Sequence, residues 1–207
     1  MLCGLHAHAQ THTLASPSQR LRVAFRRTES GEPRYSIALD RTTVLQESKL
    51  GLVRDDADFS RDLRLVDVRP VETVRDEYEL ATSKRRHNTY VANRRVFVLQ
   101  TPQGAVLETE FQVSDTGVGF RYVFPQTSAA VHRIRSEASS FNFPVGTKAW
   151  LQPVAVAKSG WESSNPSYEE LYDKEIAVGT PPHTEPAGCT RPCSEPARPG
   201  YWSARPG

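Results

Sequence analysis

Cysteine is scarce in this chain, and its placement excludes one class of fold. The 207 residues contain three cysteines, Cys3, Cys189 and Cys193, all close to the chain ends. A small secreted scaffold held by disulfides needs cysteines in its body, so this fold must rest on a hydrophobic core. Cys189 and Cys193 have no second pair at zinc-finger spacing and are a weak metal or disulfide signal.

Long apolar runs and excess charge are also missing. No stretch of about 18 apolar residues occurs, so the sequence predicts no membrane-spanning helix. The formal net charge is +2 with 24% charged residues. This balance gives no electrostatic reason to expect a nucleic-acid partner. The length suffices for one domain of about 150 to 200 residues with a real core.

Helical periodicity is poor, and Tyr168–Tyr172 is the best short helix candidate. Apolar residues instead recur at every second position, which is typical of half-buried strands. Many short strands at regular spacing predict an all-β, antiparallel β-sandwich. The expected strands lie at 21–25, 35–39, 63–68, 90–99, 105–113, 131–134 and 140–143, with turns at Gly31–Pro33 and Thr101–Gly104.

The segment Phe111–Pro125 is the most informative part of the chain. Apolar residues alternate on both sides of Asp115-Thr116-Gly117, which predicts a β-hairpin. Gly117 can adopt a positive φ in such a turn, because it has no Cβ. Arginine clusters at 85–86 and 94–95 lie in similar strand-like sequence and are either solvated strand faces or an anion or partner site.

Both ends of the chain differ from its body. Ala7-His8-Ala9 resembles the end of a secretory signal peptide, but only six residues precede it. We therefore expect residues 1–9 to be the remnant of a truncated signal, or else a short disordered leader. Residues 181–207 are rich in proline, glycine and arginine without apolar periodicity, which predicts a disordered tail. The predicted domain is residues 10–180.

Several short motifs, in order, make residues 14–180 similar to glycoside hydrolase family 97. The hairpin resembles the family's "dxGvaFRYxf" signature, and the other matching pieces are weaker singly. They are Ser16-Pro17 followed by Leu21–Phe25, Arg34–Ile37, Leu50-Gly51-Leu52, Asp58-Phe59-Ser60, Arg85–Asn88, Glu137 with Phe141, and Lys148-Ala149-Trp150.

The resemblance implies a galactose-mutarotase-like β-super-sandwich, incomplete at its C-terminal end, in front of a catalytic (β/α)8 barrel. The implied parent is a bacterial, periplasmic or secreted enzyme that acts on α-linked oligosaccharides, as an α-glucosidase or α-galactosidase. Its two catalytic carboxylates would lie in the barrel, so this chain is expected to be inactive. Calcium is the implied cofactor, and the "sYE" resemblance points to Glu169 as its ligand, with Glu170 as the fallback.

Four further residues have competing interpretations. Trp150 and Trp161 are candidates for stacking on a sugar or at a domain interface, although buried aromatic residues more often pack a core. His87 and His132 lack spaced partners and are interpreted as surface or core histidines.

The tail has a second explanation. Codon degeneracy in a shifted frame from Pro182 permits a sequence similar to the family's continuation, so we hypothesise a frameshift near residues 179–182. Cys189 and Cys193 would then carry no metal. Two alternatives to a family 97 domain remain at this point: a free-standing carbohydrate-binding β-sandwich and a small secreted structural protein.

Overall fold

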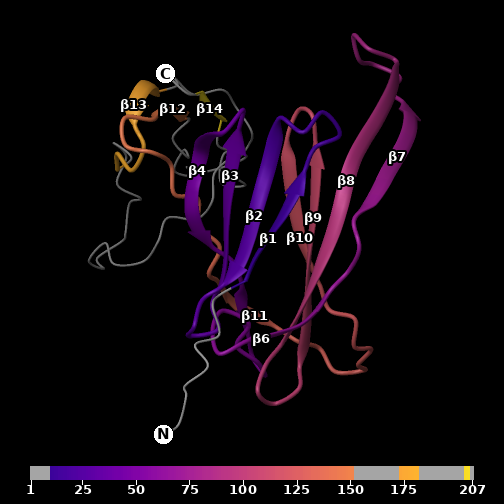
Figure 1. The fold of residues 1–207 in the computed structure, drawn as a ribbon, viewed down its shortest axis with the longest axis vertical. Coiled ribbons are helices and arrows are strands. Elements are labelled where there is room, and N and C mark those ends of the chain that lie inside the picture. The colour runs from indigo at the N-terminus through magenta and orange to yellow at the C-terminus, as the bar shows by residue number, and fades with distance from the viewer. Residues whose placement is uncertain (1–9, 152–172, 182–202, 206–207) are drawn as a thin grey trace, which may run out of the picture. The chain divides into compact units, whose positions relative to one another are not determined.

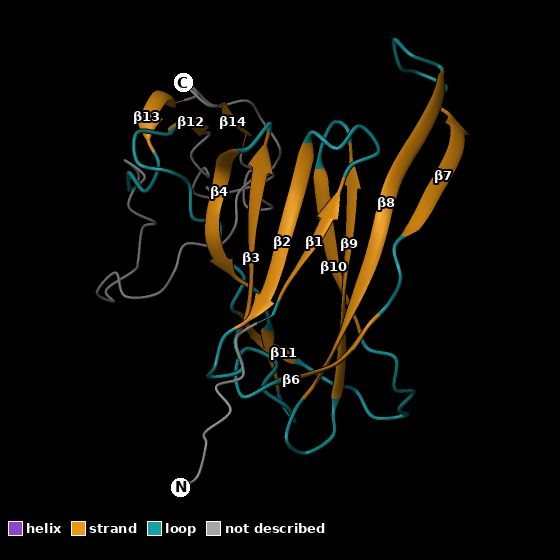
Figure 2. Cartoon of the chain, viewed as in Figure 1, coloured by secondary structure: helices purple, strands orange, loops and turns teal. Residues whose placement is uncertain are grey.

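The computed structural model describes residues 10–151, 173–181 and 203–205 of the chain. All regular structure in these residues is β, in antiparallel sheets (Figure 1; Figure 2). No helix long and apolar enough to cross a membrane occurs among them. The chain divides into two compact units, residues 1–142 and 143–207.

One sheet of the first unit is a four-stranded meander. Its strands follow one another in space as they do in sequence, each antiparallel to the next. Alternating residues of β2 and β3 point inward, among them Val23, Phe25 and Tyr35. The strands are β1 (Thr11–Ala15), β2 (Leu21–Arg27), β3 (Pro33–Leu39) and β4 (Thr42–Lys49).

The second sheet contains the predicted hairpin. Phe120 pairs with Phe111 and Tyr122 with Thr109, which confirms the pairing around Asp115–Gly117. Gly117 does not adopt a positive φ, and the Ser114 amide donates to the Gly117 carbonyl across the turn over 2.9 Å. The strand order is β10-β9-β8-β6, and β7 also pairs with β8; the strands are β6 (Arg64–Val68), β7 (Glu72–Glu79), β8 (His87–Gln100), β9 (Val106–Ser114) and β10 (Val118–Val123).

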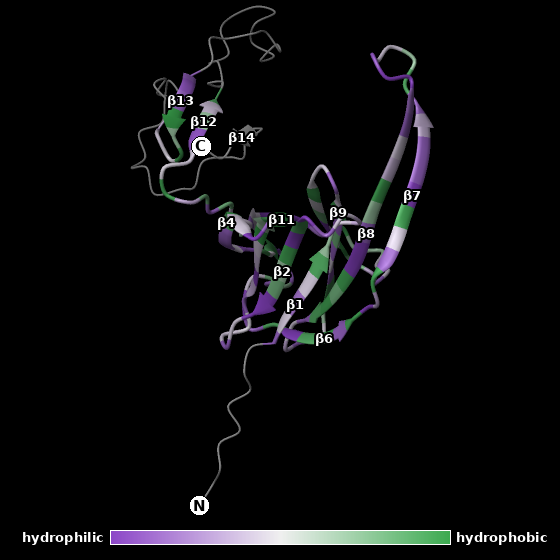
Figure 3. Ribbon diagram, turned by 45° about the horizontal axis from the view of Figure 1, so that its top comes forward, coloured by the Kyte–Doolittle hydropathy of each residue, from purple (hydrophilic) through white to green (hydrophobic). Residues whose placement is uncertain are grey.

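The two sheets pack through a cluster of aromatic rings. Phe25 of β2 stacks on Phe97 of β8 with ring centroids 4.0 Å apart, and Phe111 of β9 meets both rings edge-on. These side chains are at most 1% exposed. Buried residues recur at every second position of β2, where hydrophobic and hydrophilic residues follow one another (Figure 3). The predicted sandwich and its period-two origin are therefore confirmed.

Smaller sheets complete the description. In the first unit, β5 (Leu52–Arg54) pairs with β11 (Ile134–Glu137), so the strand expected at 131–134 begins only at its last residue. The strand expected at 140–143 is wrong, because this segment makes only an isolated bridge between Asn142 and Gln46. The second unit contains β12 (Lys148–Leu151), β13 (Asp173–Ala177) and β14 (Ser203–Arg205), in the order β13-β12-β14.

Candidate functional site

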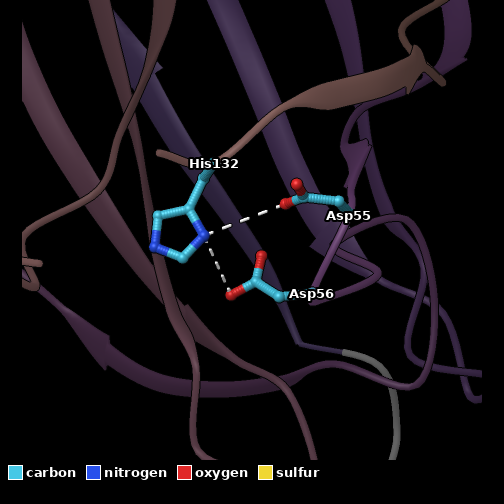
Figure 4. Close-up of side chains that lie close together, drawn as sticks. All are labelled: Asp55, Asp56 and His132. Carbon is cyan, nitrogen blue, oxygen red and sulfur yellow. Dashed lines mark ion pairs between the residues drawn. The ribbon is translucent and has the colours of Figure 1, made fainter. Parts of the chain in front are cut away.

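Three potential metal ligands meet beside the small β5–β11 sheet. Asp55 and Asp56 directly follow β5, and His132 precedes β11 (Figure 4). The His132 Nδ1 lies 3.4 Å from Asp56 Oδ2 and 3.8 Å from Asp55 Oδ1. Within the part of the chain that the structure describes, this is the one group of three or more such ligand atoms close enough to share an ion.

Backbone hydrogen bonds hold the three side chains together. The Asp55 amide donates to the Arg133 carbonyl over 2.9 Å, next to the residue that carries the imidazole. The Arg54 amide donates to the Ala57 carbonyl over 2.8 Å and closes the turn that presents both aspartates. The site is therefore made by the pairing of two segments that are about 75 residues apart in sequence.

The carboxylate of Asp56 is already hydrogen-bonded to Arg54. Its Nε donates to Oδ1 over 2.5 Å and its Nη2 to Oδ2 over 2.7 Å, a bidentate pair. The guanidinium also lies over the Phe124 and Phe59 rings, 4.9 and 5.5 Å from their centroids. The Arg54 hydrogen bonds, followed by the charges of Arg54 and His132, lower the pKa of the Asp56 carboxyl despite a smaller opposing effect of burial.

This cluster does not fit calcium. Calcium takes six to eight oxygen ligands, whereas the cluster offers two carboxylates and an imidazole nitrogen. Both oxygens of Asp56 are already bonded to Arg54. We interpret the group as an ion-pair network that fastens the segment before β11 to the turn after β5.

One of the predicted site residues lies in the described part of the chain. Trp150 is on β12, partly buried, at the register position opposite Ser203 of β14. Glu169, Glu170 and Trp161 lie outside the described residues. Their predicted roles as calcium ligands and as a sugar or interface contact therefore stay predictions, as does that of Trp150.

The two histidines have partners that no local motif indicated. His87 is exposed, and its Nδ1 lies 2.9 Å from Glu79 Oε1 on the neighbouring strand. His132 is half-buried against Asp55 and Asp56. An Asp-Asp pair is a common surface feature, and the histidine is too distant in sequence to mark it as a site.

The two arginine clusters have different surroundings. Arg94 lies 2.7 Å from Glu72, and Arg95 donates to the Thr13 carbonyl of the other sheet over 3.2 Å. This pair therefore serves contacts within the sandwich. Arg85 and Arg86 are exposed beyond the paired ends of β7 and β8.

Comparison with known proteins identifies the family. Residues 14–199 match the family described as Glycosyl-hydrolase 97 N-terminal. The chain belongs to this family. The match to the family 97 N-terminal domain includes part of the segment 181–207, whose predicted disorder and shifted reading frame stay predictions.

Individual relatives of this family 97 domain are glycosidases. A protein of Streptomyces bingchenggensis (strain BCW-1), described as a probable retaining alpha-galactosidase, is 33% identical over 150 residues, which are 70% of this chain and 23% of the relative. The crystal structure of a beta-arabinopyranosidase matches with a TM-score of 0.73 and 30% identity, over 80% of this chain and 26% of that one.

A third relative is a family 97 enzyme from Pseudoalteromonas sp. strain K8 in complex with panose. It matches with a TM-score of 0.61 and 25% identity, over 69% of this chain and 22% of that one. The family 97 N-terminal chain thus spans about a quarter of the length of these relatives. Its sequence and fold are those of the N-terminal domain of the family 97 glycoside hydrolases.

Proposed function

We propose that this chain is the non-catalytic N-terminal β-sandwich of a calcium-dependent family 97 enzyme that hydrolyses α-glucosides or α-galactosides. The observation that carries the proposal is the family match over residues 14–199. The chain spans about a quarter of the length of its relatives. The two carboxylates that glycoside hydrolysis requires would belong to the (β/α)8 barrel, which this domain supports and which binds the α-linked oligosaccharide.

The domain's own contribution to the chemistry would be one carboxylate. Glu169, with Glu170 as the fallback, would complete a calcium site whose remaining ligands belong to the barrel. The motif Ser167–Glu170 supports this assignment. The one described cluster of potential ligands does not compete for the role, because its donor set does not suit calcium.

Assays on the full chain test the non-catalytic role. We expect no release of galactose or glucose from nitrophenyl α-galactoside or α-glucoside, and no saturable binding of maltose below about 1 mM. Hydrolysis would contradict the proposal. Sub-millimolar binding of maltose would instead support the alternative of a free-standing carbohydrate-binding module.

A chimera tests the calcium ligand. Residues 14–180 of this chain would replace the matching segment of the Streptomyces relative, and activity would be measured against calcium concentration. Loss of one charged ligand should raise the half-saturating calcium concentration at least about tenfold in the Glu169→Gln variant. Glu170→Gln is the matched control, and an equal effect of both variants would count against Glu169.

The parent enzyme is proposed to be periplasmic or secreted. The motif Ala7-His8-Ala9 supports this, because small residues at these positions are typical of signal cleavage. Mass spectrometry of the native protein would show a mature N-terminus at Gln10, and an uncleaved Met1 would argue against export.

A further inference from the structure

A small cavity lies beside β3 and β4, and none of its lining residues belongs to the aspartate–histidine cluster. It measures about 230 Å³, which is below the size of most drug-binding pockets and suits one ring-sized molecule. Its lining combines one acid, two cations, a hydroxyl and three apolar side chains. These residues are Glu32, Pro33, Lys49, Leu50, Ser60, Arg61 and Ala138.

Two glycines fix the walls of this cavity. Gly31 and Gly51 have φ angles of +76° and +114°, which glycine adopts without a Cβ clash. A Cβ on Gly51 would lie 2.3 Å from the Phe59 carbonyl oxygen, and one on Gly31 would lie 2.5 Å from the Leu63 amide nitrogen. The backbone of segment 59–63 therefore packs closely against Gly51 at its start and against Gly31 at its end.

Hydrogen bonds reinforce the same walls. The Phe59 amide donates to the Leu52 carbonyl over 2.9 Å, and the Leu63 amide donates to the Gly31 carbonyl over 3.0 Å. On the other side, the Ala138 amide donates to the Gly51 carbonyl over 2.9 Å. The cavity is thus built by backbone contacts and is preformed, which lowers the entropic cost of binding.

Positive charge exceeds negative charge around Glu32 in the lining of the cavity. Glu32 accepts a hydrogen bond from Arg34 Nη2 over 2.6 Å, and Arg61 Nε donates to Asp58 over 2.9 Å. Lys49 is exposed and forms no ion pair within the described residues, but its charge, after the hydrogen bond and charge of Arg34, helps to lower the pKa of the Glu32 carboxyl. Glu32 thus faces two cations, Arg34 and Lys49, and an anionic group is the ligand chemistry that this excess of positive charge favours.

The remaining polar groups suit hydroxyls. The Glu32 carboxylate accepts one hydrogen bond through Oε2 and retains acceptor capacity on Oε1. The Ser60 hydroxyl donates to Asp58 and can accept from a ligand. We propose that this cavity binds a small hydroxylated carboxylate of the size of a single sugar acid, with Lys49 contacting its carboxylate and Glu32 its hydroxyls.

Titration of the full chain tests this site. The probe is D-glucuronate, followed by ¹H–¹⁵N spectra of residues 49–51, 59–61 and 138. We expect saturable shifts in these amides. D-glucose lacks the carboxylate and acetate lacks the hydroxyls, so both should bind at least about tenfold more weakly, as loss of one charged hydrogen bond implies. Equal binding of glucose, equal binding of acetate, or no saturation with glucuronate would each overturn the proposal.

Matched variants locate the carboxylate. Lys49→Met should weaken glucuronate binding about tenfold or more, whereas Lys49→Arg keeps the charge and should retain most of the affinity. Lys84→Met removes an equally exposed lysine far along the chain and should have no effect. An unchanged affinity in Lys49→Met would overturn the role of Lys49. None of the residues assigned to calcium contributes to this proposal, so it can fail without the proposed function failing.

Discussion

At the scale of single residues, Tyr122 joins three segments of the first unit. Its hydroxyl accepts from the Gly51 amide over 2.7 Å and pairs with the Ser139 hydroxyl over 2.6 Å. Burial raises the pKa of Tyr122 to about 12, so the phenol stays neutral under ordinary conditions. The phenol hydroxyl thus satisfies a buried backbone donor, the Gly51 amide.

Removing this hydroxyl should destabilise the chain. Tyr122→Phe leaves the buried Gly51 amide without its acceptor, which should lower the free energy of unfolding by about 1–3 kcal/mol. Urea unfolding of the full chain measures the change. Tyr78→Phe is the control, because Tyr78 is 45% exposed and its hydroxyl makes no hydrogen bond within the described residues. Equal losses in both variants would show that the Tyr122 contacts contribute nothing.

His12 should make stability depend on pH. Burial, followed by the charge of Arg95, lowers the pKa of His12 from 6.5, and its Nε2 is buried without a partner. The folded chain therefore keeps a neutral imidazole in a range where the unfolded chain gains a proton. Stability should be full above about pH 7 and should fall as the pH drops through 6.5 toward the lowered value.

The His12→Phe variant isolates this contribution. It removes the titrating group, so its urea midpoint should fall less than that of the unmodified chain between about pH 7.5 and 5.5. Carboxylates with lowered pKa values affect both chains alike and act mainly at lower pH. Parallel midpoint curves would exclude a role for His12.

At the scale of elements, β7 and the start of β8 form an arm that extends beyond the sandwich (Figure 1). The last pair between β8 and β9 is Ala92 with Ser114, whereas β7 continues to pair with β8 as far as Glu79 with His87. Free strand edges are templates for association. If β7 pairs antiparallel with β7 of a second copy about a two-fold axis, side chains that face each other lie on the same face of the sheet. One residue at the centre of the pairing therefore always faces the same residue of the other copy.

The charges on β7 disfavour every such pairing whose centre lies near the middle of this strand. Pairings centred on Arg75, Asp76 or Glu77 place like charges opposite each other. A pairing centred on Val74 brings Glu72 opposite Asp76, and one centred on Tyr78 brings Glu77 opposite Glu79. We infer that the charge pattern of β7 protects this edge from self-association.

One substitution should remove this protection. Asp76→Val places two valines at the centre of a pairing in which Arg75 faces Glu77 on both sides, so this variant should dimerise with increasing concentration. Sedimentation velocity measures the change. Asp76→Glu keeps a carboxylate at the centre of this pairing and opposite Glu72 in the pairing centred on Val74, so it should stay as monomeric as the unmodified chain. Dimerisation of both variants, or of neither, would contradict the inference.

At the scale of the whole molecule, the sequence predicted what depends on local alternation. The hairpin around Asp115–Gly117 and the sandwich were predictable, because buried residues recur at every second position in strands that are covered on one face. The arm was missed, because β7 is exposed on both faces and so shows no alternation. The meeting of Asp55 with His132 and the cavity between Gly31 and Gly51 depend on tertiary contacts that no local pattern encodes.

The distribution of the core predicts that the first unit folds by itself. All but one of the buried hydrophobic residues among those described lie within residues 10–142, and the exception is Ala149. All strands of the two large sheets also lie within this range. A fragment of residues 10–142 should therefore unfold cooperatively in urea, with a midpoint close to that of the full chain. Phe97→Ala should lower the free energy of unfolding by about 3–5 kcal/mol in either, since it empties the centre of the aromatic cluster. A fragment without a cooperative transition would show that residues 143–207 are required for this core to form.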